Sequence, residues 1–215
     1  MRLWLCGAAG VVAILCPAAL AGSPPRPAPP AGSSVDRLVL GAAQVGRGYV
    51  VHRSRGERSL QSVTLDICGF RFSSESQRLQ RLQLSYTRPH SPAVSNEAVL
   101  YQPGWAQAAL GEARNAAAHC SRGSSRGPAR GVGPVRYRVN VGTLSGLPDG
   151  YFALFVRRTG TVNGRPSDEH WLAVYQVRGD LMSIVYATGG TLHTRERLAR
   201  HAAIAAAKNL AAVAG

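Results

Sequence analysis

The clearest hydrophobic pattern in the chain is an alternation of apolar and polar residues that begins at Arg78. Leu82, Leu84 and Tyr86 alternate with polar side chains until Pro89 ends the run. A period of two places successive side chains on opposite faces of an extended backbone. The segment is therefore predicted to be a β-strand with one solvent-facing side.

The second half of the chain contains four more strand-like runs, separated by short connections. These runs are 135–141, 151–158, 170–177 and 181–187. Short connections predict an antiparallel meander. We interpret Arg178-Gly179-Asp180 between the last two runs as a glycine-centred hairpin turn, although the tripeptide also matches a cell-adhesion motif. Shorter strands are predicted at 49–52 and 97–101.

Two longer segments show helical spacing. The first follows Pro103, a residue that the first turn of a helix tolerates, and ends near Cys120. The second spans 194–213, where Leu198, Ala202, Ala206 and Leu210 recur every fourth residue. A short helix is also predicted over 35–43, with Ser34 as its N-cap. Together the pattern predicts an α+β domain, a largely antiparallel β-sheet packed with two main helices.

The N-terminus has the composition of a secretory signal peptide. Arg2 precedes an apolar stretch, and the small-residue tripeptide Ala19-Leu20-Ala21 follows it. Residues 1–21 are predicted to be removed, leaving a proline-rich linker over 22–34 and a folded domain over 35–215. An uncleaved anchor and a lipid attached at Cys16 remain as alternatives. We expect a secreted protein, with no transmembrane segment after signal cleavage.

Cysteine usage predicts one disulfide. Cys6 and Cys16 would leave with the signal peptide, so Cys68 and Cys120 are the pair that an oxidising compartment would join. Closing a loop of about 50 residues adds on the order of 4 kcal/mol to stability on the chain-entropy model.

The chain is strongly basic. Its formal net charge is +14, and every basic residue except Lys208 is an arginine. A permanent positive charge favours contact with anionic envelope polymers, although an arginine-rich composition can also reflect the genome. The segment 121–133 is predicted to be a mobile basic loop, with arginines at 122, 126 and 130.

The sequence shows no spacing typical of a catalytic or metal site. The segment 142–146 does not have the glycine positions of a nucleophile elbow. The carboxylates of Asp168 and Glu169 are adjacent, so in an extended segment they would point to opposite faces and could not act on one substrate bond. We interpret them as turn residues. No close pair of metal ligands is found among the six histidines, which are His52, His90, His119, His170, His193 and His201. We predict no enzyme activity, no cofactor and no specific nucleic-acid binding, and we assign the aromatic residues mainly to the core.

A set of short motifs resembles an actinobacterial family of secreted sensor-type domains, related to the extracellular domain of the mycobacterial serine/threonine kinase PknH. The residues that carry the resemblance are Leu65-Asp66-Ile67-Cys68-Gly69, Ser74-Glu75, Arg78, Arg81, Gln83, Ser95-Asn96-Glu97-Ala98-Val99-Leu100-Tyr101, Cys120, Leu147-Pro148, Gly179-Asp180 and Val185-Tyr186. The resemblance implies an antiparallel sheet around a cleft for an extracellular ligand, and no catalytic residues. The chain lacks the kinase domain and the second disulfide of that sensor domain, so no signalling role is implied.

Three functions are compatible with these observations. The first is a secreted, non-catalytic ligand-binding domain that acts at the cell envelope, for which the ligand and the ligand-binding residues are unknown. The second is a basic wall-associated protein held by polyanions. The third is a secreted hydrolase whose site is assembled from scattered residues. Ionic strength separates the first two, because salt weakens ionic adhesion far more than binding in a pocket.

Overall fold

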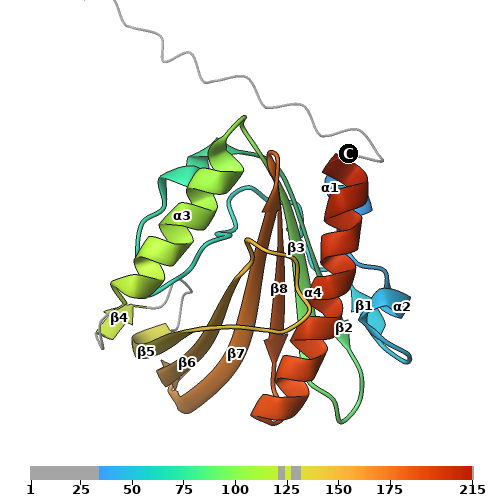
Figure 1. Cartoon of the computed structure of the whole chain (residues 1–215). Coiled ribbons are helices and arrows are strands. Elements are labelled where there is room, and N and C mark those ends of the chain that lie inside the picture. The colour runs from blue at the N-terminus through green and yellow to red at the C-terminus, as the bar shows by residue number, and fades with distance from the viewer. Residues whose placement is uncertain (1–33, 121–123, 127–131, 215) are drawn as a thin grey trace, which may run out of the picture.

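The computed structural model describes residues 34–120, 124–126 and 132–214 (Figure 1). The predicted signal peptide over 1–21 and the linker up to residue 33 lie outside the described residues. So do the arginines at 122 and 130 of the predicted basic loop.

The described residues form an eight-stranded antiparallel sheet with helices on both faces (Figure 1). The spatial order of the strands is β1-β2-β3-β8-β7-β6-β5-β4. Their bounds are β1 Val50–His52, β2 Arg78–Thr87, β3 Ala93–Tyr101, β4 Ser124–Arg126, β5 Val132–Gly142, β6 Phe152–Val162, β7 Arg165–Arg178 and β8 Leu181–Thr188. The predicted meander of four strands is confirmed as β5 to β8, and β8 pairs with β3 to join the two halves of the chain.

Two long helices cover opposite faces of the sheet, α3 on one side and α4 on the other (Figure 1). The helices are α1 Ser34–Leu38, α2 Ala42–Val45, α3 Trp105–Ala118 and α4 Leu192–Ala214, with a 3-10 helix η1 at Ser73–Gln77. The predicted α+β class is thereby confirmed. Alternate residues of each strand supply two separate cores, because they point to opposite faces.

The core under α4 also holds α1 and α2. Ala202, Ala206 and Leu210 of α4 are buried against the sheet, as their spacing predicted. In the core under α3, the helix contributes the small residues Ala109, Ala113 and Ala116, which let it lie close to the strands. Each large apolar side chain buried in these cores contributes about 1.5–3 kcal/mol.

The predicted single helix over 35–43 is two short helices. α1 ends at Leu38. At Leu40 the backbone N–H donates to Asn96 Oδ1 (2.9 Å) and the carbonyl accepts from the buried Tyr86 hydroxyl. These contacts with the sheet replace the hydrogen bonds that a continuous helix would make. Gly41 then forms the N-cap of α2.

Two other expectations need correction. The segment 121–133 is not one continuous loop, because β4 pairs with β5 and satisfies its backbone groups there. The polar side of β2 is not fully solvent-facing either. Arg81 is only 3% exposed, because a buried carboxylate on β3 lies beside it.

The predicted disulfide is present. It joins Cys68 to Cys120 with the two Cα atoms 5.8 Å apart, and it spans 52 positions of sequence. Cys120 follows α3, so the bond ties the segment before η1 to the C-terminal end of that helix.

Candidate functional site

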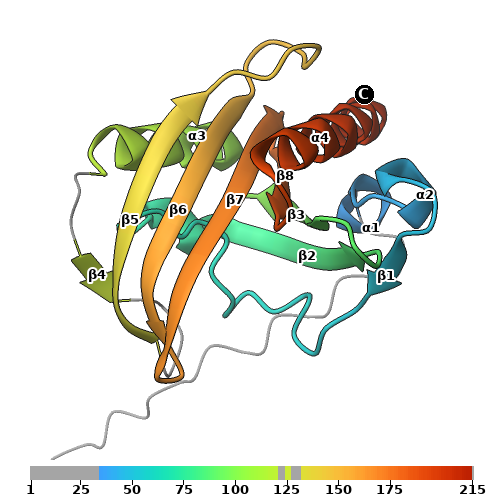
Figure 2. The same cartoon turned by 90° about the horizontal axis from the view of Figure 1, so that it is seen from below.

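The floor of the candidate site is made by side chains on the face of the sheet that carries α3. Tyr137 of β5 lies opposite Arg158 of β6, and Arg158 lies opposite Glu169 of β7. In the next row, Trp171 of β7 lies opposite Val156 of β6. Further floor residues come from β2, β3, β7 and β8, and they are Gln83, Ser95, Glu97, Tyr175, Tyr186 and Thr188. Strands β5 to β7 curve along their length (Figure 2).

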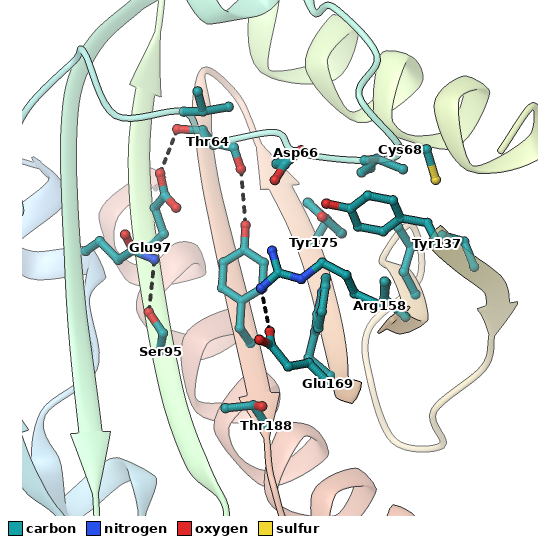
Figure 3. Close-up of a pocket in the computed structure, with 18 residues that line it drawn as sticks. Thr64, Asp66, Cys68, Ser95, Glu97, Tyr137, Arg158, Glu169, Tyr175 and Thr188 are labelled. Carbon is teal, nitrogen blue, oxygen red and sulfur yellow. Dashed lines mark hydrogen bonds and ion pairs between the residues drawn. The ribbon is translucent and has the colours of Figure 1, made fainter. Parts of the chain in front are cut away.

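The roof of the site is an irregular segment, residues 63–68, which crosses above these strands (Figure 3). Leu65 and Ile67 are buried in the core under α3. Thr64 and Asp66 line the space between roof and floor, and Cys68 continues the lining to the disulfide. Together roof and floor enclose a pocket of about 370 Å³.

Hydrogen bonds hold the roof in place although it has no regular secondary structure. The Glu75 carboxylate accepts from the backbone N–H groups of Thr64 (3.1 Å) and Leu65 (2.9 Å). The Tyr186 hydroxyl donates to the Thr64 carbonyl (3.2 Å). Just before the roof, Arg78 donates to the carbonyls of Leu60 and Ser62. With the disulfide at its other end, the roof is fixed, so the pocket is already formed without a ligand.

A buried ion pair connects the floor to the roof. Arg81 Nε donates to Glu97 Oε1 (2.7 Å), and the Thr64 hydroxyl donates to the same oxygen (2.6 Å; Figure 3). Burial raises the pKa of Glu97, and the Arg81 guanidinium opposes that rise. A buried pair of this kind costs free energy in desolvation and fixes the positions of its members.

A second ion pair lies inside the pocket. Arg158 donates to Glu169 Oε2 (2.6 Å), and its guanidinium carbon lies 5.6 Å from the centre of the Trp171 ring. Tyr137 meets Trp171 edge to face, with ring centres 6.5 Å apart. Carboxylate, guanidinium and ring therefore hold one another in a fixed arrangement.

Asp66 differs from the other two carboxylates of the pocket. Within the described part of the chain, no group hydrogen-bonds to its side chain and no arginine lies within ion-pair distance. Neighbouring side chains displace part of the water around the carboxyl and so raise its pKa, while the nearby positive charge of Arg158 lowers it. Asp66 remains exposed at the mouth, above the strands that carry Tyr137 and Arg158 (Figure 3).

The arrangement is suited to binding a small molecule. Pockets for such ligands combine apolar and aromatic walls with a few fixed polar groups. The described lining contains no histidine, and its one cysteine is in the disulfide. Among the described residues no group of three or more His, Cys, Asp or Glu side chains could hold a metal ion.

Asp168 and Glu169 point to opposite faces of the sheet, as predicted, but they are not turn residues. Both lie within β7. Glu169 faces the pocket, whereas Asp168 pairs with Arg157 on the opposite face (2.6 Å). The turn interpretation is wrong because β7 begins at Arg165, five positions before the predicted strand start at residue 170.

Sequence reasoning did not identify the pocket residues. The aromatic side chains of Trp171, Tyr175 and Tyr186 were assigned to the core, and they do contact it, but they also line the pocket. One signal was present in the sequence: Glu97 stands in an otherwise apolar strand, and a charged residue there needs a partner. The partner and the roof come from distant parts of the chain, so pattern alone could not bring them together.

The fold resembles that of a solved structure. No known family model matches the sequence, and no curated protein does either. The crystal structure of the extracellular domain of PknH from Mycobacterium tuberculosis has a similar fold, with a TM-score of 0.55 at 12% identity, over 81% of this chain and 95% of that one. The likeness is one of fold. No helix in the described ranges has both the length and the apolar character needed to cross a membrane.

Proposed function

We propose that the protein is a secreted, non-catalytic domain of the sensor type, which binds a small ligand outside the cell at the envelope. The observation that carries the proposal is the pocket, whose roof is held by the disulfide and by the Glu75 carboxylate before any ligand binds. A fixed wall lowers the ordering cost of binding, which is the usual advantage of a preformed site.

Two further observations support an extracellular role. A solved structure with a similar fold is the extracellular domain of PknH. The N-terminal pattern over residues 1–21 predicts export, and a disulfide is most stable in an oxidising compartment. Each is consistent with a domain that meets its ligand outside the cytoplasm.

The proposal can be tested by narrowing the pocket. Val139 is partly buried in the pocket wall, so Val139→Phe fills part of the space. Val141 is the matched control, because it lies two positions further along the same strand and is 62% exposed, outside the lining. Immobilised protein is incubated with the small-molecule fraction of culture medium, and retained compounds are identified by mass spectrometry. Wild type and Val141→Phe should retain a compound that Val139→Phe does not. Equal retention by all three would contradict the proposal.

A second candidate function rests on a row of arginines on the other face of the sheet. Arg136 and Arg138 of β5 are exposed, and Arg138 lies directly opposite Arg157 of β6. With Thr159 they surround a shallow hollow of about 310 Å³. Asp168 already pairs with Arg157 on this face, so Arg136 and Arg138 are the arginines of the row that an anionic polymer would contact.

Heparin serves as a probe for this second candidate. If it is correct, heparin affinity falls steeply as salt rises, and Arg136→Gln with Arg138→Gln weakens it roughly tenfold or more, because the attraction is ionic. Val139→Phe should leave heparin affinity unchanged. Heparin binding that salt does not weaken, or that the arginine changes do not affect, would exclude the row as a polyanion site.

A further inference from the structure

The pocket and the whole chain differ in the sign of their charge. The chain has a formal net charge of +14 and only 11 acidic residues. Three of these acidic residues line the pocket, together with a single arginine; they are Asp66, Glu97, Glu169 and Arg158. Three carboxylates of a strongly basic chain therefore lie around this pocket.

Two of the three carboxylates already have their own guanidinium. Glu169 pairs with Arg158 (2.6 Å), and Glu97 pairs with Arg81 (2.7 Å). Asp66 has neither an ion pair nor a hydrogen bond within the described residues. One negative charge, placed at the mouth of the pocket, is thus left to be matched by a ligand.

Apolar and aromatic side chains surround the position below Asp66. Tyr137 and Trp171 form an edge-to-face pair there, and Val139 and Val156 complete the wall on the side of β5 and β6. Aromatic faces attract cations through the ring quadrupole, and aliphatic side chains provide area for an apolar body. The volume of about 370 Å³ is at the small end of the range for ligand sites.

We infer that the pocket binds a small organic cation, with one ammonium group that pairs with Asp66 and an aromatic or apolar body that lies along Tyr137 and Trp171. The inference rests on the proposed function and specifies its ligand class. An anion would fit this site less well. The Arg158 guanidinium is already engaged by Glu169 and by the Trp171 ring, and an anion in the pocket would face three carboxylates.

Three probes of similar shape separate the possibilities: 2-phenylethylammonium, 2-phenylethanol and 3-phenylpropionate. Their affinities are measured by ligand-observed NMR titration with the full chain. The variant Asp66→Asn removes the carboxylate charge, and Asp168→Asn is the matched control because it makes the same chemical change on the opposite face of the sheet. Thermal melts check folding, and Asp66→Ser replaces Asp66→Asn should the latter not fold.

The cation should bind at least tenfold more tightly than the alcohol or the carboxylate, because only the cation forms a charge-assisted contact. Asp66→Asn should remove most of that preference, Asp168→Asn should preserve it, and Val139→Phe should weaken binding. If the alcohol or the carboxylate binds as tightly, and Val139→Phe weakens it, the cation inference is wrong while the ligand-binding function stands. If none of the three probes binds wild type, the cation inference is also wrong. The retention experiment with Val139→Phe then decides the function separately.

Discussion

Two aspartates of this protein meet opposite environments although each has an arginine nearby. Asp168 pairs with Arg157 through two hydrogen bonds on the face of the sheet opposite the pocket, and this contact lowers the pKa of Asp168. The pocket walls beside Asp66 displace part of its water, and this partial burial raises its pKa against the opposing charge of Arg158. A titration followed by NMR of the side-chain carboxyl carbons should place Asp66 above, and Asp168 below, the ordinary aspartate value. The reverse order would show that the pocket is more open to water than the structure indicates.

The raised pKa of Asp66 also predicts an effect on stability. A carboxyl whose folded pKa exceeds its unfolded value binds more protons in the folded state, so stability falls as pH rises through that window. The groups that face Asp66 are Arg158, Tyr137 and Tyr175, from β6, β5 and β7. Asp66→Asn removes the penalty, so its melting temperature at neutral pH should exceed that of wild type. A lower melting temperature would mean that the carboxylate stabilises the fold.

Unlike the Asp66 carboxylate, the side chains of Arg81 and Glu97 are both buried and bonded to each other, so losing either one should lower stability. Removing one partner leaves the other charged and unpaired in the interior. Arg81→Ala should therefore lower the free energy of unfolding by about 3–5 kcal/mol. Urea unfolding measures this, with Arg81→Met/Glu97→Met as the comparison, because an apolar pair of similar volume should cost less than the single change. A loss below about 1 kcal/mol for Arg81→Ala would show that water reaches the pair.

At the scale of the elements, the disulfide links the roof of the pocket directly to helix α3. It holds Cys68 at the end of the roof against the end of α3. Reduction, or Cys120→Ser, should lower stability by about 2–5 kcal/mol, the usual range for a native disulfide in a secreted domain. The same change should weaken ligand retention, since the roof loses the covalent bond at its Cys68 end. Thermal melts of oxidised and reduced protein measure the first effect, and identical melting temperatures would contradict it.

The elements also show where sequence patterns are informative. The long runs with a clear period, such as those that became β2, α3 and α4, were predicted correctly because burial of one face fixes their structure. The segment 35–43 was predicted as one helix because its break depends on Asn96 and Tyr86, which lie far away in the sequence. β4 was missed for a similar reason: its pairing with β5 is set by the sheet edge rather than by its own three residues.

In the whole molecule, the fold class and the disulfide followed from the sequence, whereas the pocket did not. The pocket requires β5, β6 and β7 to curve under the roof segment 63–68, and a roof without regular structure leaves no periodic pattern. The predicted absence of catalytic spacing also could not indicate what the protein binds. The contrast between a basic chain and an acidic pocket becomes visible only when distant carboxylates are placed in space.

The central claim is that this pocket is the ligand site, and mapping of amide chemical shifts tests it most directly. The protein is titrated with a fragment mixture that contains cationic, neutral and anionic compounds, and the shifts are followed in wild type and Val139→Phe. The account predicts shifts confined to residues 63–68 and to the pocket-facing parts of β5 to β8, and largely absent in Val139→Phe. Shifts that cluster around Arg136 and Arg138 on the other face, or that persist unchanged in Val139→Phe, would contradict it.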